Sequence, residues 1–145
     1  MFQKTLLALS VMWCATGAFA AWEDNNLPDT TGPMKDATTL LSEEKFDEAL
    51  VVLLKIDEDS PNEADVLNLI GYANRKIGNL DQSAIYYSRA LDVAPNHLGA
   101  LEYQAELFIL QGDLPAAQAN LARLEELCPL GCDELSTLQQ ALGGS

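Results

Sequence analysis

Residues 64–97 read ADVLNLIGYANRKIGNLDQSAIYYSRALDVAPNH, a stretch of 34 residues with a clear helical pattern. It contains two apolar patterns of helical spacing, which are separated by Gly78 and closed by Pro95. A glycine between two helical patterns and a proline after the second are typical of a helical hairpin. The stretch therefore predicts two helices, over 63–77 and 80–93.

The same pattern recurs on both sides of this stretch with a period of 34 residues, which separates Pro61 from Pro95 and Pro95 from Pro129. Small residues stand twelve positions before the three prolines, and larger ones stand eight before: Ala49, Ser83 and Ala117, then Leu53, Tyr87 and Leu121. Small residues let two helices approach closely, and the larger ones fill the space beside that contact. The prolines are expected to end the second helix of each hairpin.

Such a period is the signature of an all-α solenoid of stacked helical hairpins, here three repeats and a C-terminal capping helix. The repeats are expected at about residues 30–63, 64–97 and 98–131, within a domain spanning 33–142. The helices are predicted at 33–42, 45–59, 63–77, 80–93, 97–111, 114–128 and 133–142.

The first and last elements depart from the regular repeat. Glu44 stands in the first hairpin where the later hairpins have Gly78 and Gly112, so this hairpin is the least regular. The capping helix has an apolar face formed by Leu135, Leu138 and Leu142.

An Asn or Asp stands before the apolar helical pattern in five places: Asn62, Asn79, Asn96, Asp113 and Asp133. Each is expected to be an N-cap, whose side-chain oxygen accepts from the free N–H groups of the first helical turn. His97, the single histidine, is expected to be a surface or packing residue.

The repeat residues resemble the tetratricopeptide repeat (TPR) family, over Leu69–Pro95 with Gly78 between the helices, and again over Leu101–Pro129. The C-terminal part, with its Cys-x3-Cys turn, is similar to small exported bacterial TPR proteins. The resemblance covers about residues 30–142. It implies a superhelix whose first helices line a concave groove, with the second helices outside.

On that resemblance, the groove of the second and third repeats displays Asn68, Tyr72, Arg75, Lys76, Glu102, Tyr103, Glu106 and Ile109. This mixture suits an extended protein segment or a partner helix, with the tyrosines as rigid contact area. Glu102 and Glu106, four residues apart on one helix face, would attract a basic partner segment. Alternatively, Arg75 pairs with one of these glutamates within the protein, and Tyr103 and Ile109 pack between hairpins.

The N-terminus has the features of an export signal. A basic start at Lys4, an uncharged apolar stretch and the sequence Ala18-Phe19-Ala20 predict a signal peptide over residues 1–20. The stretch is short for a retained membrane anchor. We expect a periplasmic or secreted protein, with a flexible leader over 21–32 and a disordered tail over 143–145.

The charge and the residue types exclude several functions. The chain has 22 acidic and 8 basic residues and a net charge of −14, so binding of nucleic acid through a basic patch is not expected. A single histidine without repeated Cys/His spacing predicts no zinc finger or His-rich metal site, no cofactor and no catalytic residues, and an enzyme is not expected. The acidic surplus is expected to lie mostly on a solvated exterior.

Cys128 and Cys132 are the two cysteines left after removal of Cys14 with the signal peptide. A structural disulfide between them is the first expectation for an exported protein. The alternatives at this spacing are a redox-active pair and a soft-metal site, for example for Cu(I). Two hypotheses follow: a non-enzymatic protein–protein interaction module, acting as an adaptor or assembly factor, and a thiol redox or copper-handling protein.

Overall fold

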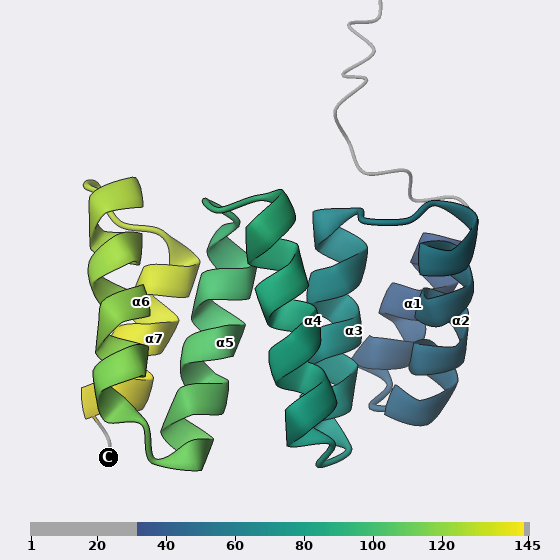
Figure 1. Cartoon of the computed structure of the whole chain (residues 1–145), viewed down its shortest axis with the longest axis horizontal. Coiled ribbons are helices and arrows are strands. Elements are labelled where there is room, and N and C mark those ends of the chain that lie inside the picture. Colours follow the sequence, from purple (N-terminus) through teal and green to yellow (C-terminus); the bar gives the residue numbers. More distant parts are fainter. Residues whose placement is uncertain (1–31, 144–145) are drawn as a thin grey trace, which may run out of the picture.

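The computed structural model describes residues 32–143, which form seven α-helices and no strand. In chain order they are α1 (Pro33–Ser42), α2 (Phe46–Asp59), α3 (Ala64–Lys76), α4 (Leu80–Val93), α5 (Leu98–Gln111), α6 (Leu114–Leu127) and α7 (Asp133–Gly143) (Figure 1). Every helix begins and ends within one residue of its predicted position. The predicted signal peptide lies outside the described residues, as do most of the leader and the last two residues of the tail.

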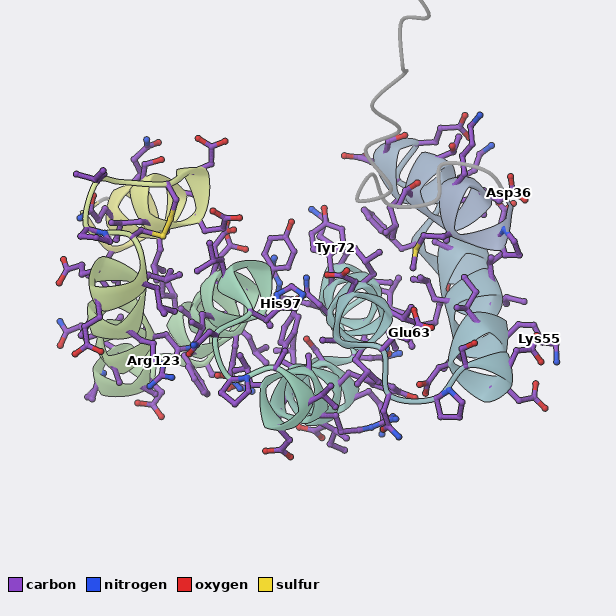
Figure 2. The ribbon with its side chains drawn as sticks, turned by 90° about the horizontal axis from the view of Figure 1, so that it is seen from above. Asp36, Lys55, Glu63, Tyr72, His97 and Arg123 are labelled. Atoms are coloured by element: carbon purple, nitrogen blue, oxygen red, sulfur yellow. A yellow bond between two sulfur atoms is a disulfide. The ribbon has the colours of Figure 1, made fainter. Side chains whose placement is uncertain are left out.

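The helices pair into three hairpins, α1–α2, α3–α4 and α5–α6, and α7 packs against α5 and α6. Seen from above, the molecule is curved, with α2, α4 and α6 on its outer side (Figure 2). The inner side has α3 and α5 as its floor and α1 and α7 as its two walls (Figure 2). We call this inner face the groove.

Close contact inside the hairpins follows the predicted pattern of small residues. Ala49, Ser83 and Ala117 are completely buried. In the second hairpin a Cβ atom on Gly71 would lie 2.6 Å from the ring of Tyr87. Ser83 Oγ donates to the carbonyl oxygen of Gly71 at 2.8 Å. The glycine therefore allows the aromatic ring to lie directly against the neighbouring helix.

The hairpin turns share one backbone conformation. Gly78 and Gly112 have positive φ angles of 88° and 78°, and Glu44, at the equivalent position of the first hairpin, has a φ of 58°. The first hairpin thus forms the same turn although its residue has a Cβ atom. The second helices end at Asp59, Val93 and Leu127, each two residues before its proline.

Helix capping confirms one predicted residue. Asp113 is the N-cap of α6, and its Oδ1 accepts from Ala116 N at 3.1 Å. Asn79 occupies the N-cap position of α4 but makes no capping hydrogen bond through its side chain. Asp133 is the first residue of α7 rather than the residue before it, so the prediction of a cap there was wrong.

The caps predicted after two of the prolines were also wrong, each by one residue. Glu63 is the N-cap of α3, and Asn62 precedes it in a left-handed conformation with a φ of 66°. His97 is the N-cap of α5, and its Nδ1 accepts from Ala100 N at 3.1 Å. Asn96 instead accepts from Arg123 Nη2 of α6 at 2.6 Å.

Two residues that were assigned to the flexible ends take part in the first and the last helix. Gly32, expected in the leader, is the N-cap of α1, and its carbonyl oxygen accepts from Lys35 N at 3.0 Å. Gly143, expected in the tail, is the last residue of α7.

Candidate functional site

The floor of the groove is aromatic. The rings of Tyr72 on α3 and Tyr103 on α5 lie 5.0 Å apart between centroids. Tyr72 points toward the open side between the two walls (Figure 2). Phe46 at the start of α2 meets Tyr72 edge-on at 6.0 Å. Both tyrosines are half-buried, so each keeps part of its surface available on the inner side.

Two cations lie over these rings. The guanidinium of Arg75 is 5.6 Å from the centroid of Tyr72 and 5.7 Å from that of Tyr103. The ammonium of Lys76 is 5.4 Å from the centroid of Phe46. These distances are within the range of favourable cation–π contact. The predicted groove residues Tyr72, Arg75, Lys76 and Tyr103 therefore form one cluster.

Arg75 forms an ion pair with Glu106 of α5, and its Nε donates to Tyr87 Oη at 3.4 Å. The arginine side chain is only 11% exposed. Of the two alternatives, the structure thus shows Arg75 paired within the protein, and its partner is Glu106. Since Glu106 already has a cationic partner, it is not a free anion in the groove.

Glu102 is different, because it has neither a hydrogen bond nor an ion pair with any described residue, although it is only 8% exposed. The pKa of Glu102 is raised to about 7, mainly by burial and also by the negative charges of Glu106 and of Glu134 on α7, against the opposing effect of Arg75. An isolated carboxylate at this depth is unfavourable. Glu102 is therefore the one strongly perturbed carboxyl group of the groove.

Asn68 lies on the side of the floor that faces α1, and it is 6% exposed. Its Oδ1 is buried without a hydrogen-bond partner. A Cβ atom on Gly99 would come within 3.2 Å of Asn68 Nδ2, so the glycine at the start of α5 leaves room for this amide.

Three pockets follow the groove from one wall to the other. A pocket of about 290 Å³ lies between α1 and α3, and its neighbour of about 260 Å³ reaches the tyrosine pair. A third, of about 190 Å³, lies toward α7. The lining residues are Met34, Thr38, Asp65, Asn68 and Leu69 in the first, Thr38, Leu41, Ser42, Leu69, Tyr72 and Tyr103 in the second, and Arg75, Glu106, Ile109, Leu110 and Ala141 in the third.

The structure adds groove residues that the sequence did not predict. Glu134 and Ala141 come from α7, which was interpreted only as a cap. The buried Leu135 and Leu138 show which face of α7 packs on the repeats. The helical spacing of these leucines could have indicated that residues beside this face reach the groove. Phe46 was missed because it belongs to a second helix, whose residues were expected outside.

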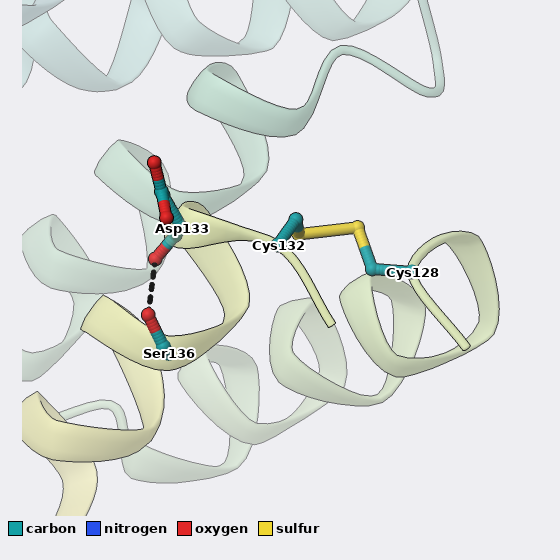
Figure 3. Close-up of a disulfide and its surroundings, with 4 residues drawn as sticks. All are labelled: Cys128, Cys132, Asp133 and Ser136. Carbon is teal, nitrogen blue, oxygen red and sulfur yellow. Dashed lines mark hydrogen bonds between the residues drawn. A yellow bond between two sulfur atoms is a disulfide. The ribbon is translucent and has the colours of Figure 1, made fainter. Parts of the chain in front are cut away.

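Cys128 and Cys132 form a disulfide, with their Cα atoms 5.8 Å apart (Figure 3). Cys128 is the C-cap residue of α6, and Cys132 immediately precedes α7. The first turn of α7 is further closed by Ser136 Oγ, which donates to the carbonyl oxygen of Asp133 at 2.9 Å (Figure 3). The bridge therefore ties the wall helix α7 to the last hairpin.

His97 also has a structural environment. Its Nδ1 accepts from a backbone N–H, so its Nε2 carries the hydrogen and donates to Asp65 Oδ1 at 2.8 Å.

Between residues 32 and 143, no group of three or more His, Cys, Asp or Glu side chains is placed to hold a metal ion. None of the helices in that range combines the length and apolar character needed to cross a membrane.

No protein-family model and no curated protein matches the chain. Solved structures do match. The type III secretion translocator chaperone SycD of Yersinia enterocolitica superposes with a TM-score of 0.70 at 16% identity, over 78% of this chain and 87% of SycD. The first TPR of Spaghetti (RPAP3), in a structure with the HSP90 peptide SRMEEVD, superposes with a TM-score of 0.65 at 18% identity, over 77% of this chain and 90% of that one.

MamA from Desulfovibrio magneticus RS-1 superposes with a TM-score of 0.62 at 20% identity, over 66% of this chain. The match covers 54% of the MamA chain, so this protein spans about half of MamA's length. Identities at this level show a shared fold. The chain therefore has a TPR-type fold of helical hairpins, as the sequence predicted.

Proposed function

We propose that this protein is a non-enzymatic interaction module, an adaptor or assembly factor, which binds a segment of another protein in its groove. The observation that carries the proposal is the half-buried pair of Tyr72 and Tyr103 on the floor, with pockets on both sides. Tyrosines held in place by packing offer contact area at a low entropic cost. The structural neighbours support this class of function, since one is a chaperone and another is seen with a peptide.

The partner segment is proposed to be basic. Glu106 is neutralised by Arg75, but Glu102 and Glu134 leave an excess of negative charge between α5 and α7. Complementary charge would guide a basic segment to this part of the groove.

The compartment is proposed to be the periplasm or the exterior of the cell. Support comes from the signal-like residues 1–20 and from the disulfide, because disulfides persist in oxidising compartments.

Retrieval of a partner by variants of opposite faces tests the proposal. Tyr72→Ser removes ring area from the floor of the groove. Ile85→Ser is a matched control, since Ile85 is an apolar residue of the outer helix α4 and 51% exposed. We expect the first variant to lose the proteins that the wild type retrieves from an exported fraction, and the control to keep them. Equal retrieval by both variants, or loss only with Ile85→Ser, would refute binding in the groove.

A further inference from the structure

Four polar side chains are buried in the part of the chain that the structure describes: Asn68, Asn74, Ser83 and Glu102. Two of them are satisfied within the protein. Asn74 Nδ2 donates to the carbonyl oxygen of Ile70 at 2.9 Å, and Ser83 Oγ donates to that of Gly71 at 2.8 Å. The side chains of Asn68 and Glu102 form no such bond with a described residue. Buried polar atoms are normally paired, and among the described residues Asn68 Oδ1 is the side-chain atom that is buried without a partner. The carboxylate oxygens of Glu102 are not fully buried, but no described cation forms an ion pair with them.

The two unpaired groups occupy equivalent positions of the repeat. Residues 68 and 102 are separated by one period of 34, and each lies in the first helix of its hairpin. Helices α3 and α5 contact each other directly. Asn68 and Glu102 are each followed by a groove residue, Leu69 and Tyr103. They therefore form a short polar row across the floor, beside the tyrosine pair.

The chemistry of the row differs between its two ends. The amide of Asn68 both donates and accepts, which matches a peptide group, and it lines the pocket whose apolar walls are Met34 and Leu69. An ionised Glu102 only accepts. The nearest cation, Arg75, is already paired with Glu106, while Glu134 adds negative charge. The Glu102 end of the row thus lacks a cation.

We infer that Asn68 and Glu102 receive a single partner segment that crosses the groove, with a backbone peptide group at Asn68 and a lysine or arginine side chain at Glu102. This inference rests on the proposed function and specifies what the groove recognises. It also explains why an unpaired amide oxygen and a carboxyl group without a cation lie on the floor, because the partner supplies the missing hydrogen bond and the missing cation.

A binding role and a structural role predict opposite effects on stability. Replacing an unpaired amide by an apolar group of similar shape, or a carboxylate without a cation by a neutral amide, is neutral or stabilising, whereas removal of a structural hydrogen bond is destabilising. Glu102→Gln and Asn68→Leu are therefore expected to keep or raise Tm and yet to weaken binding. Glu125→Gln, on the exposed side of α6, is the matched control and should change neither.

The probe is a phage-displayed library of random dodecapeptides, selected on the purified whole protein at physiological salt. We expect the selected peptides to share one lysine or arginine position. Glu102→Gln should weaken the best peptide roughly tenfold or more, and Asn68→Leu roughly threefold to tenfold. Replacing the basic residue of the peptide by norleucine should weaken binding to the wild type by the same factor as Glu102→Gln, and should have no further effect on that variant.

The results separate this inference from the proposed function. Peptides that lose binding with Tyr72→Ser but bind Glu102→Gln and Asn68→Leu as tightly as the wild type would overturn the polar row and leave the groove as the binding site. Peptides that depend on Tyr72 but share no lysine or arginine position would likewise overturn the polar row and leave the groove as the binding site. A selection in which no peptide depends on Tyr72 would overturn both. A fall in Tm with both Glu102→Gln and Asn68→Leu would show structural roles and overturn the inference alone.

Discussion

At the scale of single residues, the fold imposes its conformation even where the residue is unsuited to it. Glu44 adopts a φ of 58° at the turn position where the later hairpins have glycine. A left-handed conformation costs an ordinary L-residue about 1–2 kcal/mol, while a glycine loses about 0.5–1 kcal/mol of chain entropy on folding. Stacking of the first hairpin on the second must offset the difference.

Glu44→Gly is therefore expected to raise the free energy of unfolding, by up to about 1 kcal/mol. Gly78→Ala, at the equivalent turn, is the opposite change and should lower it by about 1 kcal/mol. Urea denaturation of the two variants measures both effects. A loss of stability with Glu44→Gly would show that its side chain makes a contribution that the structure does not reveal.

The buried carboxyl group predicts a pH dependence of stability. The folded-state pKa of Glu102 is raised to about 7, because burial and the negative charges of Glu106 and Glu134 outweigh the positive charge of Arg75. A raised pKa means that the folded state binds the proton more tightly than the unfolded state does. The stabilisation of the folded state by this bound proton is fully present below the unfolded-state pKa of Glu102, and it is lost as the pH rises through about 7.

Glu102→Gln cannot titrate at this position, so it should gain stability over the wild type at about pH 8 but not at about pH 5. The relative gain should be on the order of 1–3 kcal/mol. Unfolding curves of both proteins at the two pH values provide the measurement. A stability difference that is the same at both values would contradict burial of this carboxyl group.

At the same scale, the sequence could predict which residues reach the groove but not which of them pair. Glu102 and Glu106 are four residues apart on one helix face, so their spacing offers both equally to Arg75. The choice of Glu106 depends on the offset between α3 and α5 and on the hydroxyl of Tyr87. The predicted N-caps Asn62 and Asn96 were wrong for a similar reason. Asparagine is a preferred N-cap residue, but the turn after each proline ends one residue later, at Glu63 and His97.

At the scale of the elements, each hairpin depends on one close contact between its helices. Helix bounds were predictable because small residues and prolines recur in phase over three repeats. The contact between Gly71 and Tyr87 is the tightest example, because a Cβ atom would lie 2.6 Å from the ring. The next repeat has Ala105 and Leu121 at these two positions, which is a looser solution of the same packing problem.

Gly71→Ala is expected to lower the free energy of unfolding by about 1–3 kcal/mol, because the completely buried ring cannot move aside. The double variant Gly71→Ala/Tyr87→Leu copies the pair of the next repeat. It should recover part of the loss, although the hydrogen bond from Arg75 disappears. Thermal denaturation of the single and double variants checks this coupling, and a double variant less stable than the single one would contradict it.

Helix α7 is both a cap and a wall of the groove, and its attachment is testable. Cys128→Ser/Cys132→Ser opens a five-residue loop and should lower the stability by about 2 kcal/mol. Hydrogen exchange should become faster in α7 and remain unchanged in α3 and α4. The variant should still retrieve partners through Tyr72. Complete loss of function with an intact fold would favour the thiol redox or copper-handling alternative instead.

At the scale of the whole molecule, the stack presents one inner face with a continuous set of contact groups. The periodicity of the sequence predicted this architecture, since each helix type returns to the same side after 34 residues. The contribution of α7 to the groove was not predictable from the repeat, because α7 has no second helix to compare it with. The pairing of charges across α3, α5 and α7 likewise depends on distances in space.

Site-specific photo-crosslinking tests binding in the groove most directly. Benzoylphenylalanine is placed at position 72 on the floor or at position 85 on the outer helix α4, and crosslinked peptides are mapped by mass spectrometry. We expect position 72 to crosslink to one defined segment of a partner, with a lysine or arginine within it, and position 85 to give no specific product. Specific crosslinks from position 85 with none from position 72 would contradict the groove as the binding surface.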